Sequence, residues 1–426
     1  MVNIVIAGAG WAGCASAVAG IKAGAKVTLI EKADMILGTG LVGGIMRNNG
    51  RFTAAEELIC AGGGELINLT DKLSLHQNVN FPHHNHASLY DVTRIEPAVR
   101  SLLKKMGVDL LLKKRIVDSV VVNNRITKVI LEGKEEIAGD VFIDATGSAG
   151  PMAKCRKYGQ GCSMCILRCP SFGSRVSLAE SAGIKEEEGQ NFEETAGSIS
   201  GSCKMLKNSI DKNIILELER KGIYTIPINK KILSQEIMKV KACQQYVGSY
   251  FKNNLVLLDT GLVKLMVPYF PVEVIRRIPG LEKAIFNDPY AGGLGNSIRL
   301  LSIAPRDNTM KVEGLDNLFC AGEKSGLLVG HTEAMVTGTL AGHNAVRSGK
   351  GRKLLELPLS TAGGMLISYA REKIKTPGGK KLRFTFSGSV FFKDMIDKKM
   401  YLTDRKEIAK KIDDAGLTGI FQRKIT

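Results

Sequence analysis

The sequence contains no uninterrupted run of about 18 apolar residues, which is the length that a transmembrane helix requires. Its first residues include no basic segment and no small-residue cleavage site, so we expect no signal peptide and a cytoplasmic protein without membrane association. Internal repeats and low-complexity tracts are also missing. With 44% apolar and 24% charged residues, the composition excludes a disordered or fibrous chain. A globular chain of 426 residues is expected to form two or three domains.

The chain has fewer acidic than basic residues, 42 against 59, and the net charge is +17. Much of the basic excess lies in residues 100–115 and 371–426. Such a field attracts polyanions, including RNA. A well-solvated surface, small phosphorylated ligands or an acidic partner protein are also compatible with it. The acidic stretch KEEEGQNFEE (185–194) is expected to form a solvent-exposed loop or helix face.

The first residues follow the pattern of a βαβ unit. The apolar run VNIVIA (2–7) precedes a glycine turn, and a helix rich in small residues follows and ends at Gly24. The run KVTLIEK (26–32) predicts a second strand, so the two strands should lie parallel in one sheet. Residues 107–150 are expected to add short strands, with a hairpin at Asn123–Asn124.

The glycine turn GAGWAG has the spacing of a dinucleotide-binding fingerprint. Gly8 permits a tight turn, Gly10 lets a pyrophosphate approach the backbone, and Gly13 lets the helix pack against the strand. Free N–H groups at the helix start can then bind the phosphates. Glu31 ends the second strand, where it is placed to bind a ribose 2′-hydroxyl, which argues against NADP at this site. We place Lys32, the next residue, in the same site.

Two later segments decide between FAD and NAD, because they resemble the second and third signatures of two-dinucleotide-fold flavoproteins. VFIDATGSAG (141–150) resembles the second, a strand whose end passes close to bound FAD. GLDNLFCAGEKSGLLVGHTEAMVTGTLAGHNAV (314–346) resembles the third, whose long helix points its N-terminus at the flavin and can stabilise negative charge there. The resemblance implies FAD as the cofactor. Together with Val117, the FAD-binding residues expected from these segments are Ala145, Thr146, Gly147, Gly322, Glu323 and Thr332.

The C-terminal half narrows the resemblance to two related flavoprotein families. RRIPGLEKAIFNDPYAGGLGNSI (276–298), the third flavoprotein signature and LPLSTAGGMLISYA (357–370) follow one another in the same order in both families. One is the folate- and FAD-dependent tRNA (uracil-5-)-methyltransferases, and the other is the glucose-inhibited division protein A type, which modifies wobble uridines. The resemblance covers residues 1–150 and 270–370. It implies an FAD-dependent enzyme that acts on a tRNA or rRNA uridine.

The sequence departs from the methyltransferases at their cysteines and at one polar run. Their nucleophilic cysteine lies in a Glu-Leu-Val-Cys-Ser-Asn context, and EELICAGGG puts Cys60 in a similar place with glycines after it. Their second cysteine has no match, and GGLGNSI (292–298) replaces their His-Arg-Asn-Thr-Phe run. These departures favour a sister activity over uracil methylation. Cys60 is either a catalytic nucleophile beside the flavin or a small buried hydrophobic residue.

Four of the six histidines lie in HQNVNFPHHNH (76–86). His84 and His86 alternate on an extended segment, so both side chains could point into one catalytic site. A polar loop over the flavin edge, or an ordinary surface loop, would have the same composition. A zinc site is disfavoured because no carboxylate and no His-x-x-x-His spacing accompany these histidines.

Four of the nine cysteines lie in CRKYGQGCSMCILRCP (155–170). The last three, Cys162, Cys165 and Cys169, have the spacing that ends a bacterial ferredoxin motif, whereas the interval from Cys155 to Cys162 is longer than in that motif. Four thiolates among several Lys and Arg residues suit a metal site, and a [4Fe–4S] cluster could pass single electrons to FAD. A structural zinc site, a Cys162/Cys165 dithiol that exchanges electrons with flavin, and unligated core cysteines remain open.

The sequence therefore predicts an α/β fold with a two-dinucleotide-binding (Rossmann-like) FAD domain, discontinuous over 1–153 and 310–350. An inserted α+β substrate or redox domain is expected over 154–309, and a small basic module over 351–426. The first functional hypothesis is an FAD-dependent oxidoreductase that acts on RNA, with the cysteines as an electron relay. The alternatives are a metabolic FAD/Fe–S oxidoreductase for a small anionic substrate and a non-catalytic flavin-bound RNA-binding protein. A ferredoxin-type protein or NAD(P)H could supply electrons, and the chain could form an oligomer.

Overall fold

The computed structural model describes residues 1–147, 171–190, 198–199, 203–228, 249–266, 271–287, 298–299 and 301–426. Its α-helices are α1 (Trp11–Lys22), α2 (Gly40–Gly43), α3 (Gly50–Cys60), α4 (Glu65–Lys72), α5 (Ile95–Lys105), α8 (Leu178–Ser181), α9 (Lys212–Lys221), α11 (Ser249–Asn253), α12 (Val272–Ile275), α14 (His331–Gly349), α15 (Ala362–Ile374), α16 (Ser389–Asp397) and α17 (Arg405–Asp414). Short 3-10 turns are η1 (Lys207–Ser209), η3 (Gly322–Ser325), η4 (Gly379–Lys381) and η5 (Ile420–Gln422). In these parts of the chain, no helix has the length and apolar character needed to cross a membrane.

The strands are β1 (Asn3–Ala7), β2 (Lys26–Glu31), β3 (Ile45–Met46), β4 (Ser74–Phe81), β5 (His84–Tyr90), β6 (Asp109–Leu112), β7 (Ile116–Val122), β8 (Arg125–Leu131), β9 (Glu136–Ala138), β10 (Val141–Asp144), β11 (Glu187–Glu188), β12 (Ser198–Ile199), β13 (Lys204–Met205), β14 (Ile223–Pro227), β15 (Asn254–Asp259), β16 (Val263–Leu265), β17 (Ile298–Arg299), β18 (Ser302–Ile303) and β19 (Leu318–Cys320). The predicted βαβ unit is confirmed as β1, α1 and β2. The predicted hairpin is also confirmed: Asn123 and Asn124 have φ values of +50° and +57°, as a two-residue turn between β7 and β8 requires.

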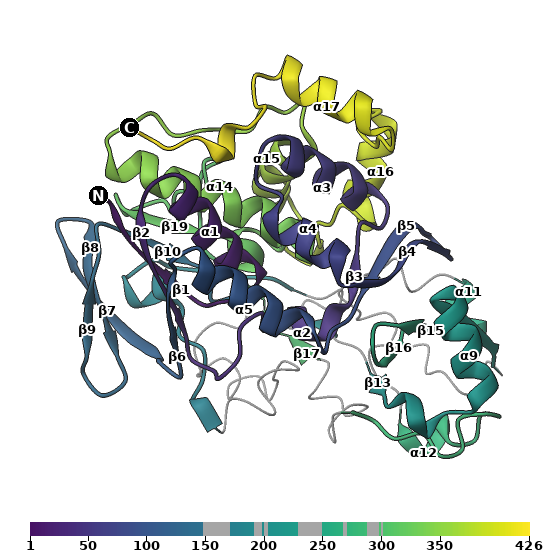
Figure 1. The fold of residues 1–426 in the computed structure, drawn as a ribbon. Helices are drawn as coiled ribbons and strands as arrows, with labels where there is room; N and C mark the ends of the chain where they lie inside the picture. Colours follow the sequence, from purple (N-terminus) through teal and green to yellow (C-terminus); the bar gives the residue numbers. More distant parts are fainter. Residues whose placement is uncertain are drawn as a thin grey trace.

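A five-stranded parallel sheet in the order β19-β10-β1-β2-β6 lies in the main body of the molecule (Figure 1). Each pair of neighbours is parallel, and in β1 and β10 the register runs from Ile4 and Val141 to Ala7 and Asp144. The carboxyl ends of β1, β2, β10 and β19 therefore meet at one edge of the sheet. In open α/β sheets, ligands bind at this edge.

Side chains alternate across this sheet and give the domain three layers. In β1, Ile4 and Ile6 belong to the hydrophobic cluster that includes α1, α5 and α14. Val5 and Ala7 point the other way, into a cluster with the small antiparallel sheet β7-β8-β9 and helix α8. The sheet thus lies between a helical layer and a β layer.

Helices α1 and α14 approach each other closely at two glycines of α14. Gly338 and Gly342 lie one turn apart on α14, and a Cβ at either position would overlap the backbone carbonyl of Ala12 or Ser16 on α1. The Ser16 hydroxyl crosses this contact and lies 2.9 Å from the Gly338 carbonyl oxygen. The close approach brings the first turns of both helices to the same end of the sheet.

The chain between β10 and β19 includes a unit with its own hydrophobic core. The antiparallel sheet β13-β16-β15-β14 packs with α9 and α12 around buried side chains such as Met205, Leu218 and Leu257. This unit lies at the lower right of Figure 1. The sheet β3-β5-β4 adjoins it, because Phe81 and Leu89 share a further cluster with Leu258.

Residues 351–426, predicted as a basic module, are packed into the main body of the molecule. The buried side chains of α15 belong to the same cluster as α1 and α14. Glu57 of α3 joins three helices, since its carboxylate accepts hydrogen bonds from Lys411 Nζ of α17 and from the Ala362 N–H at the start of α15, both at 2.8 Å. Helices α16 and α17 lie beside α3 (top of Figure 1).

The expectation that the whole KEEEGQNFEE stretch is solvent-exposed is wrong for Glu186. Its side chain is 1% exposed and forms an ion pair with Lys324, which is 0% exposed, at 2.8 Å. The hydroxyls of Ser177 and Ser302 donate to the same carboxylate. Burial alone would raise the pKa of Glu186, but Lys324 and the two hydroxyls together hold the pKa below its ordinary value. The ion pair ties this stretch to the turn η3.

Candidate functional site: a dinucleotide cleft

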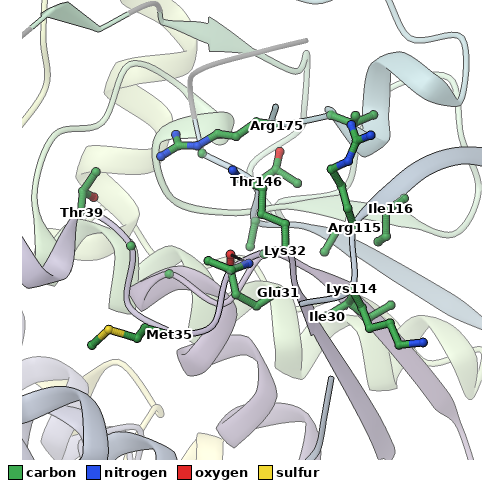
Figure 2. Close-up of a pocket in the computed structure, with 18 of the residues that line it drawn as sticks. Ile30, Glu31, Lys32, Met35, Thr39, Lys114, Arg115, Ile116, Thr146 and Arg175 are labelled. Carbon is green, nitrogen blue, oxygen red and sulfur yellow. Dashed lines mark hydrogen bonds between the residues drawn. The ribbon is translucent and has the colours of Figure 1, made fainter. Parts of the chain in front are cut away.

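An open cleft of about 910 Å³, its solvent-filled mouth included, lies at the carboxyl ends of β1, β2 and β10 (Figure 2). Its walls come from the glycine turn, the loop after β2, the start of β7, the end of β10 and the turn η3. The lining residues are Ala7, Gly8, Gly10, Ile30, Glu31, Lys32, Ala33, Met35, Gly38, Thr39, Lys114, Arg115, Ile116, Ala145, Thr146, Gly147, Arg175, Val176 and Glu323. The cleft thus unites the predicted first, second and third flavoprotein signatures.

The fingerprint glycines shape the floor of this cleft. Gly8 has a φ of +92°, and a Cβ there would lie 2.6 Å from the Ala145 carbonyl oxygen. A Cβ at Gly13 would overlap the Gly8 carbonyl, so α1 begins in direct contact with the turn. Gly10, the N-cap of α1, has open space where a Cβ would be. Since the first turn of α1 has no acidic residue, its N–H groups can bind a phosphate at Gly10.

Glu31 is held at the cleft wall by two backbone groups. Its Oε2 accepts the Ala9 N–H and its Oε1 accepts the Ala33 N–H, each at 3.0 Å. The carboxylate is therefore fixed at the end of β2, where a ribose hydroxyl can donate to it. Lys32 lies next to it and donates from Nζ to the Gly173 carbonyl oxygen at 2.7 Å.

Basic side chains dominate the upper wall of the cleft in Figure 2. Arg115 and Arg175 are drawn there above Lys32, whereas Lys114 extends at the lower right of the picture. The acidic lining residues are Glu31 and Glu323. The lining residues carry more basic than acidic groups, which suits a pyrophosphate. Lys114 and Arg115 are also ion-paired with Glu135 and Glu132, outside the lining. Ile116 lines the cleft, whereas Val117, the predicted contact, is the next residue along β7.

A buried carboxylate fixes the turn after β10. Asp144 Oδ1 accepts hydrogen bonds from the Thr146 N–H at 3.0 Å and from the Thr146 hydroxyl at 2.6 Å. Its Oδ2 accepts the Ala179 N–H at 2.9 Å and lies 3.2 Å from the hydroxyl oxygen of Ser177, which donates its proton to Glu186. Asp144 is thus a structural anchor that holds Ala145, Thr146 and Gly147 against the glycine turn.

The first turn of α14 lies next to the turn η3, whose Glu323 lines the cleft. A Cβ at Gly322, the residue before Glu323, would lie 2.9 Å from the Ala12 Cβ and 3.9 Å from the Ala334 Cβ. The turn η3 and the first turns of α1 and α14 therefore meet. Thr332 is completely buried here, and its hydroxyl has no hydrogen-bond partner among the described residues. A buried hydroxyl without a partner needs a polar group, and a bound cofactor can supply it.

An ion pair that the sequence did not reveal anchors the same helix start. Glu333 is 0% exposed, and both of its oxygens lie 3.1 Å from Arg51 Nε. The Thr385 hydroxyl and the Phe386 N–H also donate to Glu333 Oε1, at 2.7 and 2.8 Å. Arg51 in turn donates to Asn48 Oδ1 at 3.1 Å. This network joins α3, α14 and the segment before α16.

The structure does not bring Cys60 to the cleft. Cys60 is the last residue of α3, about 15 Å along the helix from Gly50 at the other end, where Arg51 contacts Glu333. The Cys60 carbonyl accepts the Gly419 N–H at 3.0 Å. Partial burial and the neighbouring carboxylates Glu56 and Glu57 raise the pKa of the Cys60 thiol. A raised thiol pKa disfavours the thiolate that a nucleophile requires.

His84 and His86 do not point into a common site. His84 is buried, and its Nδ1 lies 2.8 Å from the Asn48 side-chain amide, which links it to the Arg51 network. The His86 ring lies at the surface side of the hairpin, with its centroid 5.4 Å from the Phe52 ring. The expected alternation fails because His86 has a φ of +62° and the β4–β5 register shifts.

The predicted metal ligands Cys155, Cys162, Cys165 and Cys169 lie outside the described residues. Within the described ranges, no group of three or more His, Cys, Asp or Glu side chains is arranged to hold a metal ion. The described cysteines Cys14 and Cys320 are fully buried, and burial raises the pKa of both thiols. Both therefore pack as small hydrophobic residues.

Comparison with known proteins identifies a family model that matches most of the chain. The model described as glucose inhibited division protein A matches residues 3–262 and 261–353. Among solved structures, two crystal forms of Aquifex aeolicus GidA are similar. Form II has a TM-score of 0.69 at 16% identity and covers 99% of this chain and 74% of that chain. Form I has a TM-score of 0.67 at 15% identity. At these identities the likeness bears on the fold.

Curated relatives match a shorter segment. The methylenetetrahydrofolate–tRNA-(uracil-5-)-methyltransferase TrmFO of Methylobacterium radiotolerans is 39% identical over 98 residues, which is 23% of this chain and 20% of that protein. TrmFO of Enterococcus faecalis is 36% identical over 99 residues, which is 22% of this chain and 21% of that protein. The matched segment spans about a fifth of the length of these relatives.

Proposed function

Because the chain belongs to the glucose-inhibited division protein A family, we propose that it is an FAD-dependent enzyme that modifies a uridine in tRNA or rRNA. The cleft at the ends of β1, β2 and β10 carries the proposal, since residues of all three flavoprotein signatures line it. The TrmFO relatives are named for tRNA (uracil-5-) methylation, which supports RNA as the substrate class.

The residues of the cleft fit FAD. Gly10 leaves open space beside the N-terminus of α1 for a pyrophosphate, and Glu31 offers a fixed carboxylate for a ribose hydroxyl. Thr332 offers a buried hydroxyl without a described partner at the start of α14. When bound, FAD supplies hydride or one-carbon transfer chemistry. The N-terminus of α14 contributes positive potential at that end of the cleft, which favours negative charge there.

The activity is tested with purified protein, FAD, NADH and methylenetetrahydrofolate on transcribed tRNA and rRNA. Nucleoside mass spectrometry should show a modified uridine that depends on the protein. Because the Thr332 hydroxyl is buried without a described partner, which FAD could supply, we expect Thr332→Val to weaken FAD binding. If neither tRNA nor rRNA is modified under conditions in which FAD stays bound, the proposal is contradicted.

RNA binding is tested on the exposed basic side chains of the C-terminal helices. The salt dependence of binding to single-stranded RNA is measured as the slope of the logarithm of the binding constant against the logarithm of the salt concentration. Each phosphate contact that is lost should reduce the magnitude of this slope by about 0.7. We expect a smaller slope for the triple variant Lys398→Glu, Lys406→Glu and Lys410→Glu. A control reverses exposed lysines elsewhere: Lys26→Glu, Lys134→Glu and Lys212→Glu. Equal slopes in both triple variants would show that the C-terminal helices do not contact the RNA.

We also propose a [4Fe–4S] cluster on Cys155, Cys162, Cys165 and Cys169 that relays electrons from NAD(P)H or a ferredoxin-type donor to FAD. Its support is the sequence spacing of the last three cysteines. Anaerobic protein should contain iron and sulfide, and Cys162→Ala should lose both. Flavin absorption without iron and sulfide would refute the cluster, and zinc in its place would indicate a structural site.

A further inference from the structure

Three segments that line the cleft lead directly into one group of buried polar side chains. The cleft residues are 145–147, 175–176 and Glu323, and next to them in sequence lie Asp144, Ser177 and Lys324. Two of these segments also touch, because a Cβ at Gly147 would lie 3.2 Å from Arg175 Nη1. We call Asp144, Ser177, Glu186, Ser302 and Lys324 the cleft-wall cluster. All five side chains are buried.

Glu186 is the centre of the cleft-wall cluster. Its Oε1 accepts from Lys324 Nζ at 2.8 Å and from the Ser177 hydroxyl. Its Oε2 accepts from the Ser302 hydroxyl. A carboxylate that accepts from three groups fixes their positions relative to one another, and hydrogen bonds to a charged group are the strong ones. Glu186 therefore ties together the start of α8, the turn η3 and the strand β18.

The start of α8 extends the cluster to the turn after β10. Ser177 is the N-cap of α8, and the Ala179 N–H donates to Asp144 Oδ2 at 2.9 Å. Asp144 Oδ1 accepts from the N–H and the hydroxyl of Thr146, which lines the cleft. Hydrogen bonds therefore connect the cleft, through Asp144 and the first turn of α8, with Glu186.

The cluster also reaches the two strands that flank the β13-β16-β15-β14 unit in sequence. β11 precedes this unit and β18 follows it, and the two strands pair antiparallel with Glu188 opposite Ser302. The Ala304 N–H, directly after β18, donates to the Lys324 carbonyl oxygen at 2.9 Å. Both the backbone and the side chain of Lys324 thus connect the cleft wall with the β11–β18 pair.

We propose that Glu186 and Lys324 are positioning residues for FAD. Their ion pair holds the cleft wall in the geometry that binds the cofactor, and it couples this wall to the β11–β18 pair. Because coupling between two sites is reciprocal, FAD in the cleft should also order the two strands. The inference rests on the proposed function for FAD only, and it does not depend on the RNA substrate.

The positioning role is tested with the double variant Lys324→Met and Glu186→Leu. It removes both charges together, so no unpaired charge is buried and the protein should remain folded. The apolar side chains cannot bond to the hydroxyls of Ser177 and Ser302, so FAD should bind at least about fivefold more weakly. The affinity is read from the fluorescence of Trp11, the single tryptophan of the chain.

The matched control is the ion pair of Lys411 and Glu57, which also measures 2.8 Å and joins α17 to α3. The double variant Lys411→Met and Glu57→Leu should bind FAD as tightly as the unmodified protein, because neither residue lines the cleft. Unchanged FAD affinity in the Lys324 and Glu186 double variant would refute the positioning role.

The coupling is tested by hydrogen exchange, measured by mass spectrometry with saturating FAD and without FAD. In the unmodified protein, FAD should slow exchange in peptides that cover β11 and β18 as well as in the glycine turn 8–13. In the Lys324 and Glu186 double variant, saturating FAD should slow only the glycine turn. A β11–β18 response that is equal in both proteins, or absent from the unmodified protein, would refute the coupling.

Ser302→Ala decides if the double variant does not fold. It removes one hydrogen bond from Glu186 and leaves the ion pair in place, so the protein should bind FAD without slower exchange in β18. An unchanged β18 response would refute the inference. Absence of FAD binding by the unmodified protein would contradict the proposed function itself. Protein that shows the coupling but leaves RNA unmodified would contradict the proposed substrate and support the role of Glu186 and Lys324.

Discussion

Lys324→Met should destabilise the protein strongly, because it leaves the carboxylate of Glu186 buried without its cation. The two side chains are 0% and 1% exposed and lie 2.8 Å apart, so solvent cannot replace the lost partner. Removal of one member of a buried pair costs about 3–5 kcal/mol. The second substitution Glu186→Leu, added to Lys324→Met, removes the unpaired charge and should restore most of that loss.

The free energy of unfolding is measured by urea denaturation at pH 7 for both single variants and the double variant. As a control, Lys128→Met breaks the exposed ion pair with Glu136, whose side chains are 35% and 50% exposed, and should cost less than about 1 kcal/mol. A loss below about 1 kcal/mol for Lys324→Met, or additive losses in the double variant, would refute the reasoning.

The pKa of Glu186 is lowered in the folded protein, so its stabilisation is present above the ordinary glutamate pKa of about 4.3 and is lost as the pH falls through the folded value. The unmodified protein should therefore lose more stability between pH 6 and pH 3 than the double variant does.

Three other perturbations test the helical layer. Burial, and to a smaller extent the charge of Arg347, lower the pKa of His343 to about 4. The free energy of unfolding should therefore fall by about 3 kcal/mol as the pH drops from about 6.5, near the ordinary histidine pKa, to about 4. His343→Leu should abolish this loss, as urea denaturation at each pH can measure. Gly338→Ala should force α1 and α14 apart, which costs about 1–3 kcal/mol and weakens FAD binding, as calorimetry and Trp11 fluorescence can measure. Arg51→Met leaves Glu333 buried and unpaired, and should lower the unfolding midpoint more than the exposed control Lys128→Met does.

Local patterns predicted the parts of the fold that depend on neighbours in sequence. The apolar run of β1, the small residues of α1 and the Asn123–Asn124 turn each determine their own conformation, and the structure confirms them. The β3-β5-β4 sheet was not predicted, because β4 carries polar residues on both sides and its pairing with β5 shifts register. Likewise, the burial of Glu186 depends on Lys324, which is distant in sequence.

The candidate site likewise contains residues that the sequence predicted and residues that only the fold brings together. Gly8, Gly10, Gly13 and Glu31 belong to one continuous motif, so their positions in the cleft follow from the sequence. Arg51 and Glu333 are separated by 282 residues, and a single sequence has no signal that pairs them. Arg115 ends the basic run 100–115, so its charge was visible although its place in the cleft was not.

The order of strands in the central sheet has a consequence for synthesis of the protein. β10 ends at Asp144, but its neighbour β19 begins at Leu318 and α14 ends at Gly349. At about 5–20 residues per second, the ribosome needs roughly 10–40 seconds to make the intervening chain. During that time one edge of β10 has no partner strand, and the face of α1 that Gly338 later covers is open. Cofactor loading therefore comes late in translation or after it, and the nascent chain is most exposed to chaperones and to misassembly in this interval.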